Sequence, residues 1–263
     1  MKPSIRGATV WLAIAVASTL ASGYATADPP DPTTAPFQVV THDNQKDWKI
    51  DTAGGTVTFQ PATGCDAPSA RGTGALHLTV FPGDGYARLR NGRYNNTPLA
   101  DLTALDYWTC DNNNNGQQWP FIMLHVDWNG DHQPDDIIFF EPSYQNPAEG
   151  GGCGAVSNQA MPALHTWQHW DALRGSDGST AQACWWSLND PTFMPGDVIR
   201  SLSQYVLQHP GATIVNPSGN FGGVQIVHGF ASPSDNFDGY ADSVRIGAKN
   251  ANSTVTYDFE PAS

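Results

Sequence analysis

Five oxygen-bearing side chains lie within ten residues of one another, between two apolar segments. They are Asp127, Asn129, Asp131, Asp135 and Asp136. Carboxylates crowded onto one loop repel one another unless a cation lies among them. Oxygen ligands at alternate positions suit a hard cation such as Ca²⁺. The spacing therefore predicts a structural calcium site in this loop.

The loop departs from an EF-hand in its glycine and in its flanks. In an EF-hand the glycine follows the third ligand, whereas Gly130 precedes Asp131, and aspartates replace the closing glutamate. The flanking residues 121–126 and 137–140 are β-branched and aromatic, which predicts a β-hairpin with an acidic loop. The alternative is an Asx turn whose acids face water without an ion.

Aromatic residues form the second candidate site. The chain has nine tryptophans, and sugar rings present C–H groups that pack on exposed Trp and Tyr beside polar side chains. Neighbouring residues of a strand face opposite sides, so one member of each close tryptophan pair is expected in the core. Trp119 and Trp128, which lie in or beside polar loops, are expected to be exposed. The predicted ligand-binding residues are Trp119, Trp128, Tyr144, Trp170 and Trp186, with core packing as the alternative for each.

Acid–base chemistry has candidate residues but no diagnostic spacing. Glu141 ends an apolar strand, where a half-buried carboxylate with a raised pKa could serve a glycosidase or a lyase. Further candidates are His125, Asp127, His132, Glu149, His165, His169 and Asp171. The sequence has no nucleophile elbow, H-E-x-x-H motif or phosphate-binding loop. Binding is therefore predicted in preference to catalysis.

The chain begins with the features of a secretory signal peptide. Lys2 and Arg6 precede an apolar run, and residues 25–27 supply a small-x-small cleavage site. We expect cleavage near Ala27 and secretion to the extracellular or periplasmic space. Residues 28–36 then form a Pro/Thr-rich leader that is extended or disordered. No later stretch has the length and apolarity of a membrane span, so no membrane insertion is expected.

Charge limits the classes of partner. The chain has 12 basic and 25 acidic residues, and loss of Lys2 and Arg6 leaves 10 basic against 25 acidic, a net charge of −15. Nucleic acids and anionic membranes select basic patches, so neither is expected as a partner. The charge is compatible with cation binding, and the oligomeric state stays open.

The four cysteines predict two disulfides. They are Cys65, Cys110, Cys153 and Cys184. An even number in an exported protein is typical of disulfides, and the spacing does not match a zinc site. Three connectivities are possible, and pairing within each half (Cys65 with Cys110, Cys153 with Cys184) joins neighbouring segments. A catalytic cysteine is the alternative.

The intervening segments predict the scaffold. Short β-branched and aromatic runs alternate with Gly, Pro, Asn and Asp clusters, which is typical of an all-β antiparallel sandwich. One amphipathic helix is predicted over 197–209, with Asp197 as its N-cap and Pro210 just after its end. Residues 149–154 are expected to form a glycine-rich loop. A single domain is predicted over 37–263.

Several segments together resemble a group of exported bacterial domains. The segments are GTGALHLTV, YARLRNGRYNNTPLADLTALDYWT, HVDWNGDHQPDDIIFFEPSY, TWQHWDAL, SLSQYVLQHPGATIVN and NFDGYADSVRIG. The resemblance implies a jelly-roll sandwich of the carbohydrate-binding-module or lectin-like kind and carries over no catalytic residue. We therefore predict a secreted, calcium-stabilised module that binds a glycan or another cell-surface ligand. The alternatives are a polysaccharide-active enzyme of glycosidase or lyase type and a structural or adhesive envelope protein.

Overall fold

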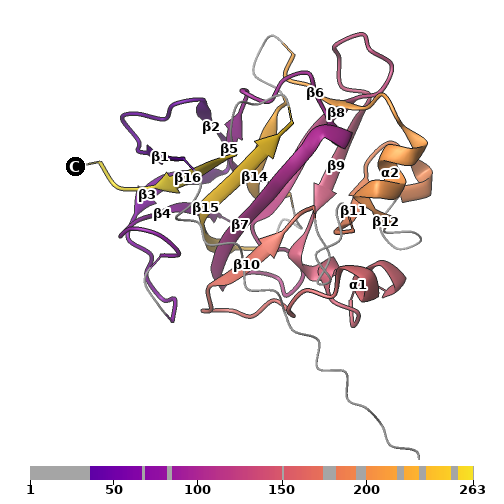
Figure 1. Cartoon of the computed structure of the whole chain (residues 1–263). Coiled ribbons are helices and arrows are strands. Elements are labelled where there is room, and N and C mark those ends of the chain that lie inside the picture. The colour runs from indigo at the N-terminus through magenta and orange to yellow at the C-terminus, as the bar shows by residue number, and fades with distance from the viewer. Residues whose placement is uncertain are drawn as a thin grey trace, which may run out of the picture.

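Two β-sheets face each other in the computed structural model of the chain (Figure 1). The structure describes residues 36–66, 69–81, 85–149, 151–173, 182–193, 200–217, 222–230, 235–249 and 254–262. The predicted signal peptide and all but the last residue of the predicted leader lie outside these ranges. The predicted all-β sandwich is confirmed.

The first sheet contains seven of the described strands. Its main path runs β1 (Phe37–Val40), β16 (Val255–Phe259), β15 (Phe237–Ala248), β4 (Ala75–Val80) and β3 (Gly55–Gln60). On its other side β15 pairs with β7 (Leu102–Asn113), which pairs in turn with β10 (Gln168–Asp171). The pairs are antiparallel except for β1 with β16, which is parallel.

The second sheet contains nine of the described strands and holds the residues of the candidate site. Its main path runs β12 (Arg200–Ser201), β11 (Cys184–Ser187), β9 (Asp136–Phe140), β8 (Phe121–Asp127), β14 (Val224–Gly229), β5 (Tyr86–Asn91) and β2 (Trp48–Ala53). The short β13 (Thr213–Ile214) pairs with β8 and with β6 (Thr97–Pro98). The predicted acidic hairpin is confirmed as β8 and β9.

The main core lies between the two sheets. Ile122, Leu124 and Val126 alternate along β8 and are fully buried in it. The β-branched and aromatic composition of these strands suits a pleated surface that is covered on one side. Fully burying one such side chain contributes about 1.5–3 kcal/mol. Large aromatic residues from both sheets, such as Trp48 and Trp170, fill the space between them.

The helices differ from the prediction at two places. Helix α2 (Leu202–Gln208) begins at Leu202, so the start predicted at Asp197 is wrong; Asp197 itself lies outside the described residues. Ser201 is the N-cap, because its hydroxyl accepts the Gln204 N–H while the Gln204 side chain accepts the Ser201 N–H, which forms a capping box. A second helix, α1 (Gly151–Ser157), occupies part of the region predicted as a loop. Three 3₁₀ turns complete the described helices: η2 (Leu99–Asp101), η3 (Pro142–Gln145) and η4 (Pro191–Phe193).

Both disulfides pair as predicted. Cys65 bonds to Cys110 and Cys153 bonds to Cys184, and the second bond ties α1 to β11. Two disulfides are compatible with an extracellular or periplasmic protein. None of the helices that the structure describes is long and apolar enough to cross a bilayer.

A buried amide beside the second disulfide connects three elements. Gln145, in η3, donates to the carbonyl oxygens of Glu141 (2.8 Å) and Cys184 (3.0 Å). Its Oε1 accepts the Ser157 hydroxyl (2.8 Å) and the Cys184 N–H (2.9 Å). All four hydrogen bonds lie in the interior, so the turn after β9 has a fixed position relative to β11 and α1.

We predict that Gln145→Leu lowers the free energy of unfolding by about 3 kcal/mol, because buried backbone and hydroxyl groups lose their partners. Urea denaturation measures the change. Gln133→Leu, at an exposed loop position, is the matched control and should change stability by less than about 0.5 kcal/mol. Equal stabilities of the two variants would contradict the role assigned to Gln145.

Candidate functional site

The second sheet presents a second set of side chains on the face that points away from the main core. Alternate residues of a strand face opposite sides, so Met123 and His125 of β8 point outward while Leu124 points into the core. A separate hydrophobic cluster confirms this outer face: it contains Phe121, Met123, Phe139 and Val227, with Ile137 and Trp186 packed against it. We call this surface the outer face.

One row of side chains crosses the outer face from strand to strand. The pairing register aligns Lys49, Arg90, Gln225, Met123, Phe139 and Trp186, in that order. Adjacent strands lie about 4.8 Å apart, so the row spans about 24 Å. One end is cationic and polar and the other end is aromatic. The two end residues are exposed Lys49 and partly exposed Trp186, and the four residues between them are buried.

The aromatic end is a stacked pair. The rings of Phe139 and Trp186 have centroids 3.9 Å apart and an interplanar angle of 10°. Phe121 approaches the other side of this group, with its ring centroid 6.1 Å from that of Phe139. Because neighbours hold the Trp186 ring in place and part of it stays exposed, it is a rigid apolar platform at the edge of the face.

The cationic end is built around one carboxylate. Arg88 donates to Asp51 Oδ2 from Nε (2.9 Å) and from Nη2 (2.5 Å). Arg90 Nε lies 3.5 Å from the same oxygen, without forming a hydrogen bond. Burial lowers the pKa of Arg90 from its usual value, the Coulomb attraction of Asp51 opposes that shift, and Arg88 adds to it.

Several buried polar atoms without hydrogen-bond partners lie on this face. Of the fifteen buried side-chain atoms of this kind among the described residues, five belong to Arg90, His125 and Gln225, and a sixth, the Trp186 indole N–H, lies close to the Glu141 carboxyl group. Both amide atoms of Gln225, which is fully buried, and both ring nitrogens of His125 are included. Buried polar groups in proteins are nearly always paired with protein, water or ligand, and each unpaired one costs about 1–3 kcal/mol. The unpaired atoms of Arg90, His125 and Gln225 are therefore candidates for hydrogen bonds to water or to a ligand.

His125 and Glu141 are both uncharged over part of the physiological pH range. Burial, and then the charges of Arg88 and Arg90, lower the pKa of His125 to about 4. Burial raises the pKa of Glu141 to about 7, and the nearby indole N–H of Trp186 offsets part of the rise. The sequence identified Glu141 as a half-buried acid, and the structure places it beside the aromatic end of the outer face.

Two of the predicted aromatic residues line a small pocket that follows β9. Trp119 and Tyr144 face a space of about 90 Å³ together with Ser143 and Glu149. Trp119 is only 6% exposed, so the expectation that it is exposed was wrong; residues 116–117 and 161–162 surround it. Tyr144 is half-buried, and burial, followed by the charges of Glu141 and Glu149, raises its pKa.

Trp170 and Trp128 lie away from the outer face. Trp170 is completely buried in the main core, and its indole N–H donates to Thr109 Oγ1 (2.8 Å). Its prediction as a ligand-binding residue was therefore wrong, because β10 turns this side chain inward. Trp128 is half-buried and stacks on His209, the C-cap of α2, with ring centroids 4.1 Å apart. Of the predicted aromatic residues, Trp186 alone belongs to the row described above.

The side chains of the acidic loop bind the loop's own backbone. Asp127 accepts N–H groups from Asn129 (3.0 Å) and Gly130 (2.7 Å) at Oδ1. Asp135 Oδ2 accepts the N–H groups of Trp128 (2.8 Å) and Asn129 (3.1 Å), and Asp131 Oδ1 accepts that of Gln133 (2.8 Å). These are Asx-type turns, in agreement with the alternative that needs no ion.

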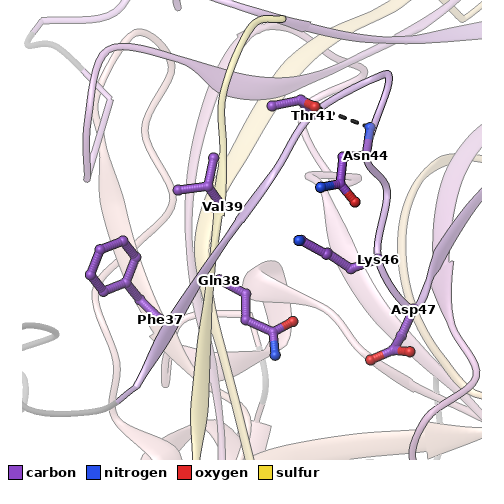
Figure 2. A pocket seen from close by; sticks show the side chains of 7 residues that line it. All are labelled: Phe37, Gln38, Val39, Thr41, Asn44, Lys46 and Asp47. Atoms are coloured by element: carbon purple, nitrogen blue, oxygen red, sulfur yellow. Dashed lines mark hydrogen bonds between the residues drawn. The ribbon is translucent and has the colours of Figure 1, made fainter.

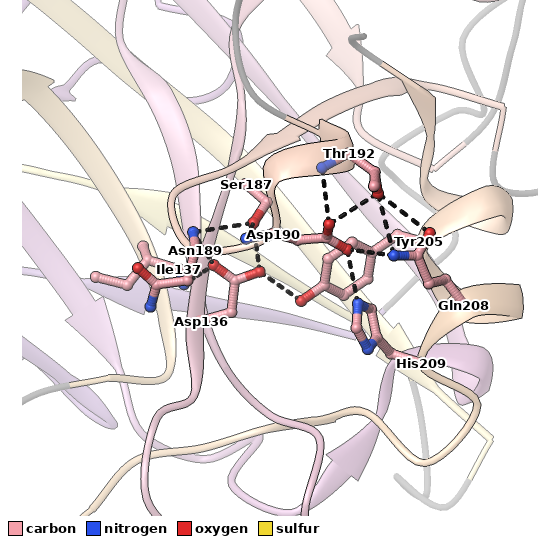
Figure 3. A network of polar contacts seen from close by, with 9 residues as sticks. All are labelled: Asp136, Ile137, Ser187, Asn189, Asp190, Thr192, Tyr205, Gln208 and His209. Atoms are coloured by element: carbon pink, nitrogen blue, oxygen red, sulfur yellow. Dashed lines mark hydrogen bonds and ion pairs between the residues drawn. The ribbon is translucent and has the colours of Figure 1, made fainter.

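Asp136 lies apart from the other acids of the loop and connects the hairpin to α2 (Figure 3). It is completely buried. Its Oδ2 accepts the hydroxyls of Ser187 (2.6 Å) and Tyr205 (2.7 Å), and its Oδ1 accepts the Asn189 N–H (3.0 Å). In the same network Asp190 Oδ2 lies 2.8 Å from His209 Nε2. Asp136 is thus a structural anchor between β9, β11 and α2.

No group of three or more His, Cys, Asp or Glu side chains is placed to hold a metal ion within the part of the chain that the structure describes. Calcium binding by Asp127, Asn129, Asp131, Asp135 and Asp136 stays a prediction.

Another pocket among the described residues lies along the edge strand β1 (Figure 2). Its volume is about 720 Å³, and it is lined by Phe37, Gln38, Val39, Thr41, Asn44, Lys46 and Asp47. Most of these side chains are solvent-exposed. None of the buried atoms without partners belongs to a residue that lines it. We therefore place the candidate site on the outer face.

Comparisons with known proteins leave the chain without an assigned family. No protein-family model and no curated protein sequence matches it. One similar solved structure is described as a crystal structure with xylogluco-oligosaccharide. The two chains are 12% identical, the match covers 76% of this chain and 37% of that one, and the TM-score is 0.31. Any function must therefore be inferred from the chain's own residues and geometry.

Glu141 should make stability depend on pH. Its pKa of about 7 in the folded protein lies above the ordinary value of 4.5. The protonated carboxyl group therefore contributes fully to the free energy of unfolding below pH 4.5, and this contribution is lost as pH rises through 7. The wild type should lose up to about 3 kcal/mol of its free energy of unfolding between pH 4.5 and pH 8. Glu141→Gln should not show this loss. Urea denaturation at the two pH values measures this loss. The exposed Glu149→Gln is the control, and an equal pH dependence of wild type and Glu141→Gln would contradict the burial of this carboxyl group.

Proposed function

We propose that the protein binds an extracellular carbohydrate across its outer face. The observation that carries this proposal is the row that joins unpaired polar atoms at Arg90 and Gln225 to the stacked rings of Phe139 and Trp186. A sugar needs both kinds of contact, because its hydroxyl groups form hydrogen bonds while its C–H faces pack on aromatic rings. The row provides them on rigid strands about 24 Å across.

We also propose that the protein is secreted after cleavage near Ala27. The two disulfides support this, because such bonds form and persist in oxidising compartments. A glycan or another cell-surface ligand is then the partner that the outer face would meet.

The enzyme alternative has one observation in its favour. A carboxyl group with a pKa of about 7, as at Glu141, suits a general acid. However, Asp51, at the opposite end of the face, lies four strands away, or about 19 Å. The paired carboxylates of glycosidases are about 5–9.5 Å apart. Glu141 and Asp51 are therefore too far apart to form such a pair, and binding is the function that we propose.

Calcium in the acidic loop is a separate proposal, supported by three carboxylates, those of Asp127, Asp131 and Asp135, on one turn. If the ion stabilises the loop, a chelator lowers the melting temperature of the wild type, and Asp127→Ala combined with Asp131→Ala removes that sensitivity. Differential scanning calorimetry with and without chelator measures both effects. Unchanged melting of the wild type would contradict calcium binding and leave the loop as a turn held by its own hydrogen bonds.

The structure separates two tryptophans that the sequence treats alike. Trp186→Ala should weaken polysaccharide binding by at least about 10-fold, equivalent to about 1.4 kcal/mol, because the aromatic platform is removed. The matched control, Trp128→Ala, should retain binding, because Trp128 stacks on His209 away from the outer face. Retardation in native gels cast with soluble polysaccharides measures both variants.

Melting curves show whether each variant is folded. Binding by folded Trp186→Ala at wild-type strength would contradict the proposed site. Absence of binding to every polysaccharide would favour the structural or adhesive alternative, and release of new reducing ends would favour the enzyme alternative.

A further inference from the structure

The polar end of the outer face has a charge opposite to that of the whole protein. The chain has a net charge of −13. At its polar end the row pairs Lys49 with Arg90, and the next row on the same face pairs Asp51 with Arg88. These two rows nevertheless contain three cations and one anion. This local positive excess lies within a strongly acidic molecule, so it is not a consequence of composition.

The single anion is already engaged by one of the cations. Arg88 donates twice to Asp51 Oδ2, at 2.9 and 2.5 Å. Arg90 reaches only to 3.5 Å from the same oxygen, and its Nε is buried without a hydrogen-bond partner. Arg90 is 6% exposed. A buried cation whose pairing is incomplete is costly, so an added anion beside Arg90 would offset an existing penalty.

A neutral amide lies beside Arg90. In the pairing register Gln225 is its direct neighbour on β14, and both amide atoms of Gln225 are free. Burial, and then the charges of Arg88 and Arg90, lower the pKa of His125 to about 4, so His125 is uncharged at neutral pH. Glu141 follows the end of β9, which is three strands away from the strand of Arg90. The Arg90 guanidinium and the Gln225 amide could each donate a hydrogen bond to one carboxylate, which accepts two parallel hydrogen bonds.

The aromatic platform sets a minimum length for the ligand. Trp186 lies four strands from Arg90 along the row, which is about 19 Å. A ligand that contacts both must cross the strands and contain several sugar units. A single small acid would reach only one end.

We infer that the ligand of the outer face is an acidic polysaccharide, one of whose carboxylates binds Arg90 and Gln225 while a sugar further along the chain packs on Trp186. This inference rests on the proposed carbohydrate binding and specifies its substrate class. The carboxylate supplies the anion that Asp51 does not provide for Arg90. The polymer runs across the strands, from β5 to β11.

Native gels cast with four polymers test this inference. Polygalacturonate supplies carboxylates, and its fully methyl-esterified form has the same backbone without the charge. Dextran sulfate supplies a different anion, and hydroxyethylcellulose supplies a neutral glucan. We expect retardation by polygalacturonate, at least 10-fold weaker retardation by its ester, and loss of affinity as NaCl is added.

Arg90→Gln should weaken binding to polygalacturonate at least 10-fold. Arg93→Gln removes the same charge at an exposed position nearby and should bind as the wild type does. Arg90→Lys keeps the charge but loses the planar fork, so it should bind with intermediate affinity. If Arg90→Gln does not fold, Arg90→Lys and the salt dependence of the wild type still decide the question.

The outcomes separate the inference from the proposed function. Equal binding of the ester and the acid, or wild-type affinity of folded Arg90→Gln, would overturn the acidic ligand while carbohydrate binding stands. Retardation by dextran sulfate but not by polygalacturonate would overturn the carboxylate. Failure of all four polymers, followed by failure of a wider glycan array, would overturn the proposed function itself.

Discussion

Side-chain alternation along β5, β8 and β14 is the constraint on which the rest of the structure depends. Because Leu89, Leu124 and Ile226 must seal the core between the sheets, their neighbours Arg90, His125 and Gln225 are forced onto the opposite face. The fold thus determines both the order of the row and its exposure to solvent at the two ends.

The outer face lowers the stability of the protein, and other parts of the molecule offset the loss. Unpaired atoms at Gln225 and His125 each lower stability, and natural proteins retain such departures mainly where function requires them. Other parts of the structure offset this loss of stability. They are the main core on the opposite face of the sheet, the hydrogen bonds of Gln145 to β11, and the hydrogen bonds of Asp136 between β9 and α2. A rigid sheet of this kind holds its ligand groups in place before binding, which reduces the entropy lost on association.

The scaffold was largely predictable from the sequence, because strands, turns and disulfides depend on local patterns. The run around Ile122 and the cysteine pairing of Cys153 with Cys184 are examples. The start of α2 was placed too early, because periodicity does not show where a helix begins, whereas the S-x-x-Q capping box at Ser201 does. Trp170 was misassigned, because alternation says that one of two residues is buried without saying which.

The site was less predictable, because its residues come from six strands. Lys49 and Gln225 join one row only when β2, β5 and β14 are adjacent, and strand order is not visible in a local pattern. A signal was present in Arg88 and Arg90, two cations at alternate positions of one buried strand. The acidic loop shows a second limit, since Asp127 has the same spacing whether it binds an ion or the backbone N–H groups of its own turn.

The central claim is that the outer face binds an acidic sugar chain through Arg90, Gln225 and Trp186. A crystal structure of the protein soaked with an oligogalacturonate tests it most directly. The structure predicts a carboxylate within hydrogen-bond distance of Arg90 and Gln225, and a sugar ring parallel to the indole of Trp186. Ordered water on every unpaired atom of the row, with the oligosaccharide absent or bound at another surface, would contradict it.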